Sequence, residues 1–409
     1  MSPDPTGIYI HIPFCATKCA YCDFLSFAVN SDNCDGATAH MEAYVDALLR
    51  EMEKYTSPGK IDTVYFGGGT PTALPPHLLC KILTAVGRFP LTADVEITIE
   101  ANPGTLTPEY LQALKNGRCV SQAMYQQFTP ATCQLCVPTP PVGAHSVRPH
   151  LLPLASSPNR LSLGLQTTQP HLLTAINRTH TMGDFLQNYH AARQAGFTNI
   201  NIDLMFALPG QTLDDWADIL DTIIALAPQH ISAYSLTPAE NTPLWDALDS
   251  GQICLPSEET DRAMYHLAIK RLTEAGYTHY ELSNFAKPGF ESRHNVNCWR
   301  RVPYRAFGLG AHSFDGARRW HNAQDMAAYL AGDVAPQDVE VLTPADVDAE
   351  TMILGLRLLQ GVPEKDVPAR YENTVAAQIK KGLLTHENGC VRLTSLGLDL
   401  ANQVFEAFL

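Results

Sequence analysis

The first two thirds of the chain alternate between short apolar runs and longer amphipathic stretches. Six runs have the length of buried strands, and most of them contain β-branched residues: IYIHI (8–12), DTVYFG (62–67), VEITIEA (95–101), RLSLGL (160–165), NINIDLM (199–205) and HISAYSL (230–236). Between them, stretches at 40–55, 76–87, 182–195 and 214–227 have helical periodicity. Strands separated by helix-length crossovers predict parallel β/α units. Six units favour a partial (β/α)6 barrel over a complete barrel of eight.

The last part of the chain has a different pattern. DVDAETMILGLRLLQGV, which begins at residue 346, predicts an amphipathic helix, and the residues from 380 onward predict a helix, a hairpin and another helix. We therefore expect a core barrel over residues 1–335 and a small helical, winged-helix-like domain over 336–409.

Residues 118–158 interrupt the alternation. They are rich in proline, poor in charge and without a sustained period, and a loop of this length is unusual inside a compact domain. Cys133 and Cys136 form a C-x2-C pair there, but no second ligand pair follows at a suitable spacing. The pattern favours an unstructured insertion over a second metal site.

Composition and net charge limit the functional classes to which this protein can belong. Of 409 residues, 45% are hydrophobic, and 28 basic against 42 acidic residues give a net charge of −14, which argues against a nucleic-acid partner. Eleven cysteines, an odd number clustered towards the N-terminus, indicate reduced thiols in a cytoplasmic compartment. MSPDPT has no signal-peptide features, and no apolar run reaches the roughly 18 residues of a membrane span.

The stretch IPFCATKCAYCDF carries the clearest chemistry. Cys15, Cys19 and Cys22 have the spacing C-x3-C-x2-C with no fourth cysteine nearby, whereas a structural zinc site needs four ligands. A partial zinc site and buried thiols are the unremarkable alternatives. Three thiolates would leave one iron of a four-iron cluster open to an amine–carboxylate ligand.

Further motifs follow the other strands, where barrel sites are expected. YFGGGTPT (65–72) lets the backbone approach a ligand closely, but no Gly-Lys-Ser/Thr follows, which argues against a phosphate loop. Glu100 ends the third predicted strand, where a carboxylate can offset a cationic ligand or simply cap a turn. Asp203 lies in an apolar strand and needs a partner, for which we favour a ligand. Taken alone, Gln166 and Arg178 cannot be distinguished from ordinary surface residues.

Taken together and in order, these motifs resemble a known family. The cysteine stretch, GGGTPT, EANPGTLT, NRLSLGLQ, NRTH, IDLMFALPGQT and a late HNVNCW resemble the radical S-adenosylmethionine (SAM) superfamily, and within it oxygen-independent coproporphyrinogen III oxidase and its relatives. The resemblance implies a [4Fe–4S] cluster on Cys15, Cys19 and Cys22. It also implies SAM contacts at Tyr9, Tyr21, Gly68, Gly69, Thr70, Glu100, Gln166, Arg178 and Asp203.

Two departures separate the chain from the oxidase. The oxidase has a further cysteine where this chain has Phe24, and it has a long N-terminal extension, whereas the first strand here begins by Ile8. Both departures match the HemW-type branch, heme chaperones with an H-N-x-x-Y-W motif. HNVNCW retains His294 and replaces the tyrosine with Cys298, and both side chains can ligate heme iron.

The sequence therefore predicts a heme chaperone that binds heme and a SAM-liganded cluster and delivers heme to hemoproteins. An oxidative decarboxylase of coproporphyrinogen and another radical SAM enzyme acting on a tetrapyrrole, such as a methyltransferase, are the alternatives. The chaperone needs acceptor hemoproteins, and a flavodoxin or ferredoxin is the class of reductant such a cluster would use. A homodimer is compatible with the sequence.

Overall fold

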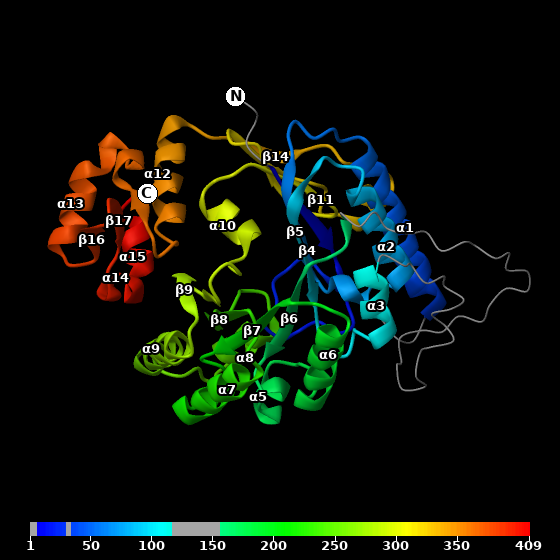
Figure 1. Ribbon diagram of the computed structural model, residues 1–409, viewed down its shortest axis with the longest axis horizontal. Coiled ribbons are helices and arrows are strands. Elements are labelled where there is room, and N and C mark those ends of the chain that lie inside the picture. The colour runs from blue at the N-terminus through cyan, green and yellow to red at the C-terminus, as the bar shows by residue number, and fades with distance from the viewer. Residues whose placement is uncertain (1–5, 30–33, 117–155) are drawn as a thin grey trace, which may run out of the picture.

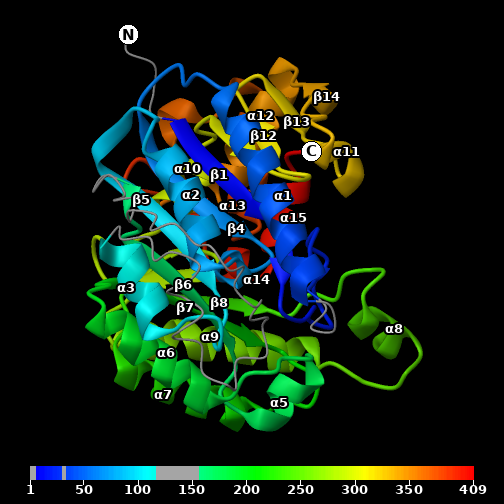
Figure 2. The same cartoon turned by 90° about the vertical axis from the view of Figure 1, so that its right-hand side faces the viewer.

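The computed structural model describes residues 6–29, 34–116 and 156–409. Its centre is a curved 12-stranded sheet with helices packed on its outer face (Figures 1 and 2). The predicted insertion lies outside the described residues except for 156–158, and Cys133 and Cys136 lie outside them as well.

The middle of the sheet consists of the six predicted strands, all parallel and neighbours in chain order. They are β1 (Thr6–Ile12), β4 (Ile61–Gly68), β5 (Leu91–Ala101), β6 (Arg160–Gln166), β7 (Asn199–Phe206) and β8 (His230–Ser235). Helices cover their outer side: α1 (Cys34–Glu53), α2 (Pro76–Val86), α3 (Pro108–Asn116), α5 (Pro170–Ala175), α6 (Met182–Gln194), α7 (Leu213–Leu226) and α9 (Glu258–Glu274). The mixed α/β architecture of six parallel β/α units expected from the sequence is confirmed.

The starts of two of these helices can be recognised from the local sequence. Thr181 begins α6 and Thr212 begins α7, and each hydroxyl accepts from the backbone N–H three residues later. Asp184 and Asp215 complete the reciprocal capping boxes, which satisfy N–H groups that the first turn would leave unpaired. The local sequence therefore marks where these two crossover helices begin.

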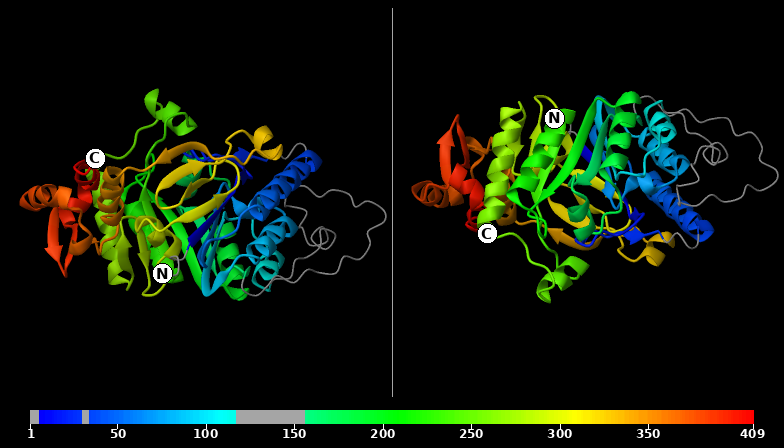
Figure 3. Two further views of the ribbon diagram at one scale, coloured as in Figure 1. Left: turned by 90° about the horizontal axis from the view of Figure 1, so that it is seen from above. Right: turned by 90° about the horizontal axis from the view of Figure 1, so that it is seen from below.

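Shorter strands extend the sheet at both edges. On one side β11 (Tyr304–Phe307) pairs parallel to β1, and β12 (His312–Phe314), β13 (Arg318–His321) and β14 (Gln337–Val341) follow antiparallel. On the other side β10 (Asn284–Ala286) and β9 (Thr278–Glu281) follow β8 antiparallel. Three short helices complete this part: α8 (Pro243–Asp249), which projects outward (Figure 3), α10 (Arg293–Trp299) and α11 (Met326–Leu330).

The sheet interior is unusually polar. Thr63, Glu96, Thr98, Arg160, Ser162, Asn201 and His230 are buried on strands whose outward residues pack against the helices. Helix α10 lies against the amino-terminal part of these strands, because the Glu96 carboxylate accepts from the backbone N–H groups of Arg293 and His294, each at 3.1 Å. These paired groups meet the requirement that buried polar atoms be hydrogen-bonded.

The C-terminal elements have a hydrophobic cluster of their own. They are α12 (Pro344–Gly355), β15 (Val362–Pro363), α13 (Glu372–Lys380), β16 (Leu384–Glu387), β17 (Cys390–Leu393), α14 (Ser395–Asp399) and α15 (Ala401–Glu406). Strand β14 belongs to the main sheet, so that sheet reaches past residue 335. The division into 1–335 and 336–409 stays a prediction.

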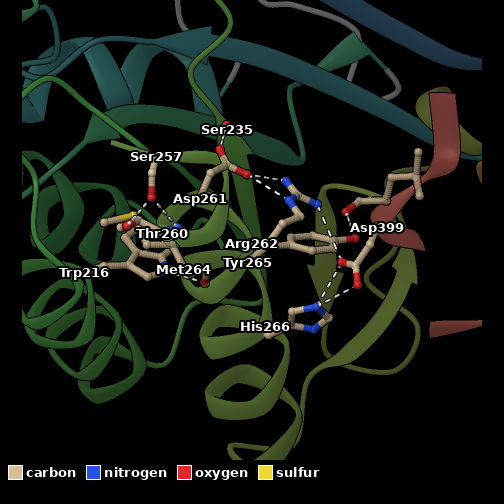
Figure 4. Close-up of polar contacts among 11 residues, drawn as sticks. Trp216, Ser235, Ser257, Thr260, Asp261, Arg262, Met264, Tyr265, His266 and Asp399 are labelled. Atoms are coloured by element: carbon tan, nitrogen blue, oxygen red, sulfur yellow. Dashed lines mark hydrogen bonds and ion pairs between the residues drawn. The ribbon is translucent and has the colours of Figure 1, made fainter. Parts of the chain in front are cut away.

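A polar cluster joins this C-terminal part to α9 (Figure 4). His266 contacts the Asp399 carboxylate at 2.9 Å, and Arg262 contacts the same carboxylate at 3.9 Å and also pairs with Asp261. Asp261 in turn accepts a hydrogen bond from Ser235 at the end of β8. The C-terminal part is thus attached next to the carboxyl end of the sheet.

Candidate functional site: a three-cysteine cavity and its neighbour

The cysteine loop is closed at its base by a two-stranded pair, β2 (Phe14–Cys15) and β3 (Phe27–Ala28). The N–H groups of Phe27 and Val29 donate to the carbonyls of Pro13 and Cys15 at 2.7 and 2.8 Å. Cys19 and Cys22 lie between the two hydrogen-bonded ends of this loop. All three thiols therefore belong to one loop whose ends are held together. It follows the carboxyl end of β1, as the sequence predicts.

The tip of the loop is held by two distant segments. The N–H of Ala20 donates to the carbonyl of Ile176, and the side chain of Asn177 donates to the carbonyl of Lys18 at 2.9 Å. From the other side, the N–H of Leu244 donates to the carbonyl of Ala20 at 2.9 Å. The thiols are therefore positioned by α5 and α8 as well as by their own spacing.

The glycine-rich end of β4 packs directly against the cysteine loop. The N–H groups of Gly69 and Thr70 donate to the carbonyls of Ile12 and Phe14. A Cβ at Gly69 would lie 2.7 Å from the Phe14 carbonyl oxygen and 3.0 Å from the Cys15 sulfur, so only glycine fits without a shift. The Thr70 hydroxyl lies 3.6 Å from the Cys15 sulfur.

Arg178 brings positive charge to the thiols. Its Nη1 lies 3.4 Å from the Cys19 sulfur, and its Nη2 donates to Asn102 Oδ1 at 2.9 Å. Burial raises the pKa of the Cys15 and Cys22 thiols. Metal binding would release these protons, since thiolates are the ligating form.

Two carboxylates line the same wall. Glu100 accepts from the Tyr65 hydroxyl at 2.6 Å, and its desolvation raises the pKa of the carboxyl to about 7. Asp203 has three protein partners, Ser162, Asn201 and Tyr234, at 2.6–3.0 Å. A carboxylate in an apolar strand needs hydrogen-bond partners, and here β7 itself and the neighbouring strands β6 and β8 supply them. A ligand contact of Asp203 stays a prediction.

Gln166 ends β6 in the left-handed region, with φ of 70°. Its Oε1 is buried and has no hydrogen-bond partner among the described residues. A buried acceptor without a partner is costly unless a ligand fills the gap. This favours a ligand donor at Gln166.

The structure brings most of the predicted residues around one cavity of about 460 Å³. Its walls include Cys15, Cys19, Tyr21, Cys22, Gly68, Gly69, Thr70, Glu100, Gln166, Arg178 and Asp203. Within the described ranges, no three His, Cys, Asp or Glu side chains are arranged to hold a single metal ion. Three thiols on one loop, an adjacent guanidinium and an open cavity beside them fit an iron–sulfur cluster with a small charged ligand.

The remaining predicted residues, Tyr9, His294 and Cys298, line a second cavity of about 770 Å³. The two cavities share Lys18, Asp23, Phe24, Ser26, Gly68 and Glu100. The expectation that motif residues follow the strands is wrong for His294 and Cys298. They belong to α10, which the Glu96 contacts hold at the amino-terminal part of the sheet.

His294 is buried against the inner strands. Its Nδ1 lies 3.1 Å from the Thr63 hydroxyl, and its ring stacks on Tyr65 with centroids 5.1 Å apart. Burial lowers the pKa of His294 to about 4 and raises that of Cys298 to about 11. Both side chains are therefore neutral at pH 7, and neutral imidazole is the form that ligates metals.

Sequence reasoning missed several residues of the two cavities. Asn102 donates to the Thr70 hydroxyl at 2.7 Å and accepts from Arg178, so it connects the β4 and β5 ends to the guanidinium. Asn102 could have been identified from its position directly after a predicted strand, because barrel sites lie at the ends of strands. Tyr234 and His11 lie inside predicted strands near their carboxyl ends, which is a weaker signal, whereas His312 had none that could be separated from an ordinary histidine.

Sequence comparison decides the family. The chain is 33% identical to the heme chaperone HemW of Bacillus subtilis (strain 168), covering 98% of both chains, and 30% identical to heme chaperone HemW of Escherichia coli (strain K12), covering 99% of this chain and 98% of the other. The chain belongs to the HemW family of radical SAM proteins. Residues 9–125 and 139–223 match the radical SAM superfamily, and 342–400 match the HemN C-terminal domain.

The HemW-family fold is shared with a solved structure. Coproporphyrinogen III oxidase (HemN) from Escherichia coli, described as a radical SAM enzyme, superposes with a TM-score of 0.77 over 99% of this chain and 90% of the other, at 21% identity. This likeness shows the fold alone. No helix among residues 6–29, 34–116 and 156–409 is long and apolar enough to cross a bilayer.

Proposed function

We propose that this HemW-family chain is a heme chaperone. Cys15, Cys19 and Cys22 hold a [4Fe–4S] cluster, SAM occupies the adjoining cavity, and heme binds in the second cavity before passing to acceptor hemoproteins. When bound, the cluster supplies a Lewis-acidic iron that takes the amino and carboxylate groups of SAM. The observation that carries the proposal is the pair of joined cavities, one lined by the three thiols and the other by neutral His294 and Cys298.

The residues around the first cavity have distinct roles in this proposal. Gly68, Gly69 and Thr70 present backbone to SAM, and Tyr21 contributes an aromatic wall. Tyr9 lines the second cavity and would contact SAM from that side. Gln166 supplies the unpartnered oxygen, and Arg178 pairs with the carboxylate of SAM. Glu100 and Asp203 offset its positive charges.

The second cavity is large enough for a small-molecule ligand and has both aromatic and polar side chains in its walls. Its volume falls within the roughly 300–1,000 Å³ usual for small-molecule sites. Its wall has Phe24 where a fourth cysteine would favour the oxidase. His294 and Cys298 contact the heme from the inner wall, where Thr63 and Tyr65 fix the imidazole.

The cellular setting is part of the proposal. Thiols that bind iron must stay reduced, which supports a cytoplasmic location. A flavodoxin or ferredoxin would reduce the cluster, and acceptor hemoproteins receive the heme.

Anaerobic iron–sulfur reconstitution followed by EPR tests the function. We expect the EPR signal of the reduced cluster to change on adding SAM, a Soret band of bound heme to appear on adding hemin, and that heme to move to apomyoglobin as a generic acceptor. His294→Ala should weaken hemin binding, and serine at any of the three cysteines should lower the iron content. Conversion of coproporphyrinogen to protoporphyrinogen, or no hemin binding at micromolar protein, would contradict the proposal.

A further inference from the structure

Three histidines line the second cavity, and they differ in how their ring nitrogens are used. His11 has both engaged: Nδ1 lies 3.1 Å from the Tyr9 hydroxyl and Nε2 lies 2.8 Å from the Leu25 carbonyl oxygen. His294 has Nδ1 engaged with Thr63 and is 7% exposed. Neither ring can turn towards a ligand without losing buried contacts.

His312 is placed differently. It begins β12, is exposed to solvent, and makes no hydrogen bond through its ring to the described residues. Its ring lies beside that of His321, with centroids 5.1 Å apart. His321 has its own partners, Asp338 at 2.9 Å and the Asn322 carbonyl at 2.7 Å, so His312 alone of this pair has both nitrogens available. Desolvation and His321 lower the pKa of His312, which keeps the imidazole in its neutral, ligating form.

The same cavity has an exposed apolar part. Phe24 is 60% exposed and Phe27 is 42% exposed, and both line the cavity. A single exposed ring is ordinary, but two exposed rings that line one cavity form an apolar patch of the kind that meets an apolar ligand or partner. Both lie on the cysteine loop, on a different segment from His312, so a flat ligand has apolar contacts and a nitrogen donor within one cavity.

Resting on the proposed heme function, we propose that His312 is an axial ligand of the heme iron and that Phe24 and Phe27 contact the porphyrin. His294, on the inner wall, contacts the heme without ligating it. A ligand at the exposed side of the cavity suits a chaperone, because an acceptor histidine can replace it without local unfolding. Axial-ligand identity also sets the spectrum of the bound heme, which makes the assignment observable.

The test compares the spectra of variants of the full chain, titrated with hemin. His312→Ala should lower hemin affinity by about tenfold or more and shift the Soret maximum and ferric EPR g-values of the heme that still binds. His312→Met should restore affinity with a third spectrum, since methionine is also an axial ligand. His294→Ala should weaken binding and leave the spectrum of bound heme unchanged. His190→Ala, an exposed histidine on α6, is the control for adventitious ligation and should match the wild type.

The outcomes separate this assignment from the function on which it rests. If wild-type protein binds no hemin, the heme function itself fails. If wild-type protein binds hemin and His312→Ala reproduces its affinity and spectrum, the function stands and the His312 assignment is overturned. A spectral change in His312→Ala supports the assignment, whereas a spectral change in His294→Ala would overturn the statement that His294 contacts the heme without ligating it.

Discussion

At the scale of single residues, the cavity depends on polar groups whose ordinary properties are altered by burial. Glu100 shows this most directly, because desolvation raises its pKa to about 7 and the Tyr65 hydrogen bond offsets only part of that rise. A carboxyl with a raised folded-state pKa holds its proton more tightly in the folded chain than in the unfolded one. Its contribution to stability is therefore largest below pH 4.5 and is lost as the pH rises towards 7.

The raised pKa of Glu100 leads to a prediction about how SAM affinity depends on pH. A cationic ligand favours the ionised carboxylate, so the affinity advantage of wild type over Glu100→Gln should grow with pH below 7, by up to about tenfold per unit, and level off above it. Calorimetric titration with SAM from pH 5.5 to 8.5 measures both proteins. Using their ratio removes the ionisations of SAM and of other residues that the two share. A ratio independent of pH would contradict a contact between Glu100 and SAM.

At the scale of elements, one carboxylate fastens α1 to the short strands at the edge of the sheet. Glu51 accepts from the backbone N–H of Gly308 at 3.0 Å, the Asn322 side chain at 2.8 Å and the Tyr329 hydroxyl at 2.8 Å. It is 3% exposed, and Arg305 lies 3.7 Å away. Strands as short as β11 and β12 gain little from their own pairing, so such a shared anchor matters.

Removing that anchor should therefore be costly. Glu51→Ala leaves several buried donors without an acceptor, and we expect the free energy of unfolding to fall by about 3 kcal/mol or more. Urea denaturation followed by circular dichroism measures the change. Glu53→Ala is the matched control, because Glu53 lies on the same helix in a largely exposed pair with Arg88 and should change stability by less than about 0.5 kcal/mol. Equal effects of the two substitutions would contradict the anchoring role.

At the scale of the whole molecule, the cysteine loop and the described residues that flank 117–155 lie at opposite ends of the parallel strands. The cysteine loop follows the carboxyl end of β1, whereas the connection that contains residues 118–155 leads into the amino end of β6. Because the six central strands are parallel, their amino ends share one edge and their carboxyl ends share the other.

We therefore expect the cluster to survive loss of the insertion. Replacing residues 118–155 with a short Gly/Ser linker should leave the iron and sulfide content per protein unchanged after anaerobic reconstitution. Cys19→Ser in the same shortened chain is the control that must lose iron. A loss of iron on shortening alone would show that the insertion supports the site, or that Cys133 and Cys136 bind iron themselves.

Local sequence determined a large part of this structure. The six central strands lie within a few residues of their predicted limits, because each is an apolar run of strand length and most contain β-branched residues. The helices that cross between them begin at capping residues that can be read directly, such as Thr181 and Thr212. The spacing of Cys15, Cys19 and Cys22 suffices to place them on one loop, and the SAM and heme contacts remain predictions.

Other features exist only in the folded chain. Strands β9 to β14 are three to five residues long, too short for a period to be recognised, and they form because the edges of the central sheet offer unpaired backbone groups. The position of His294 inside the sheet follows from α10 donating to Glu96, almost 200 residues away in sequence. Spacing along the chain fixes which residues share a loop or a strand end. Which distant segments meet across a cavity depends on the packing of the whole sheet, and this decided the second cavity.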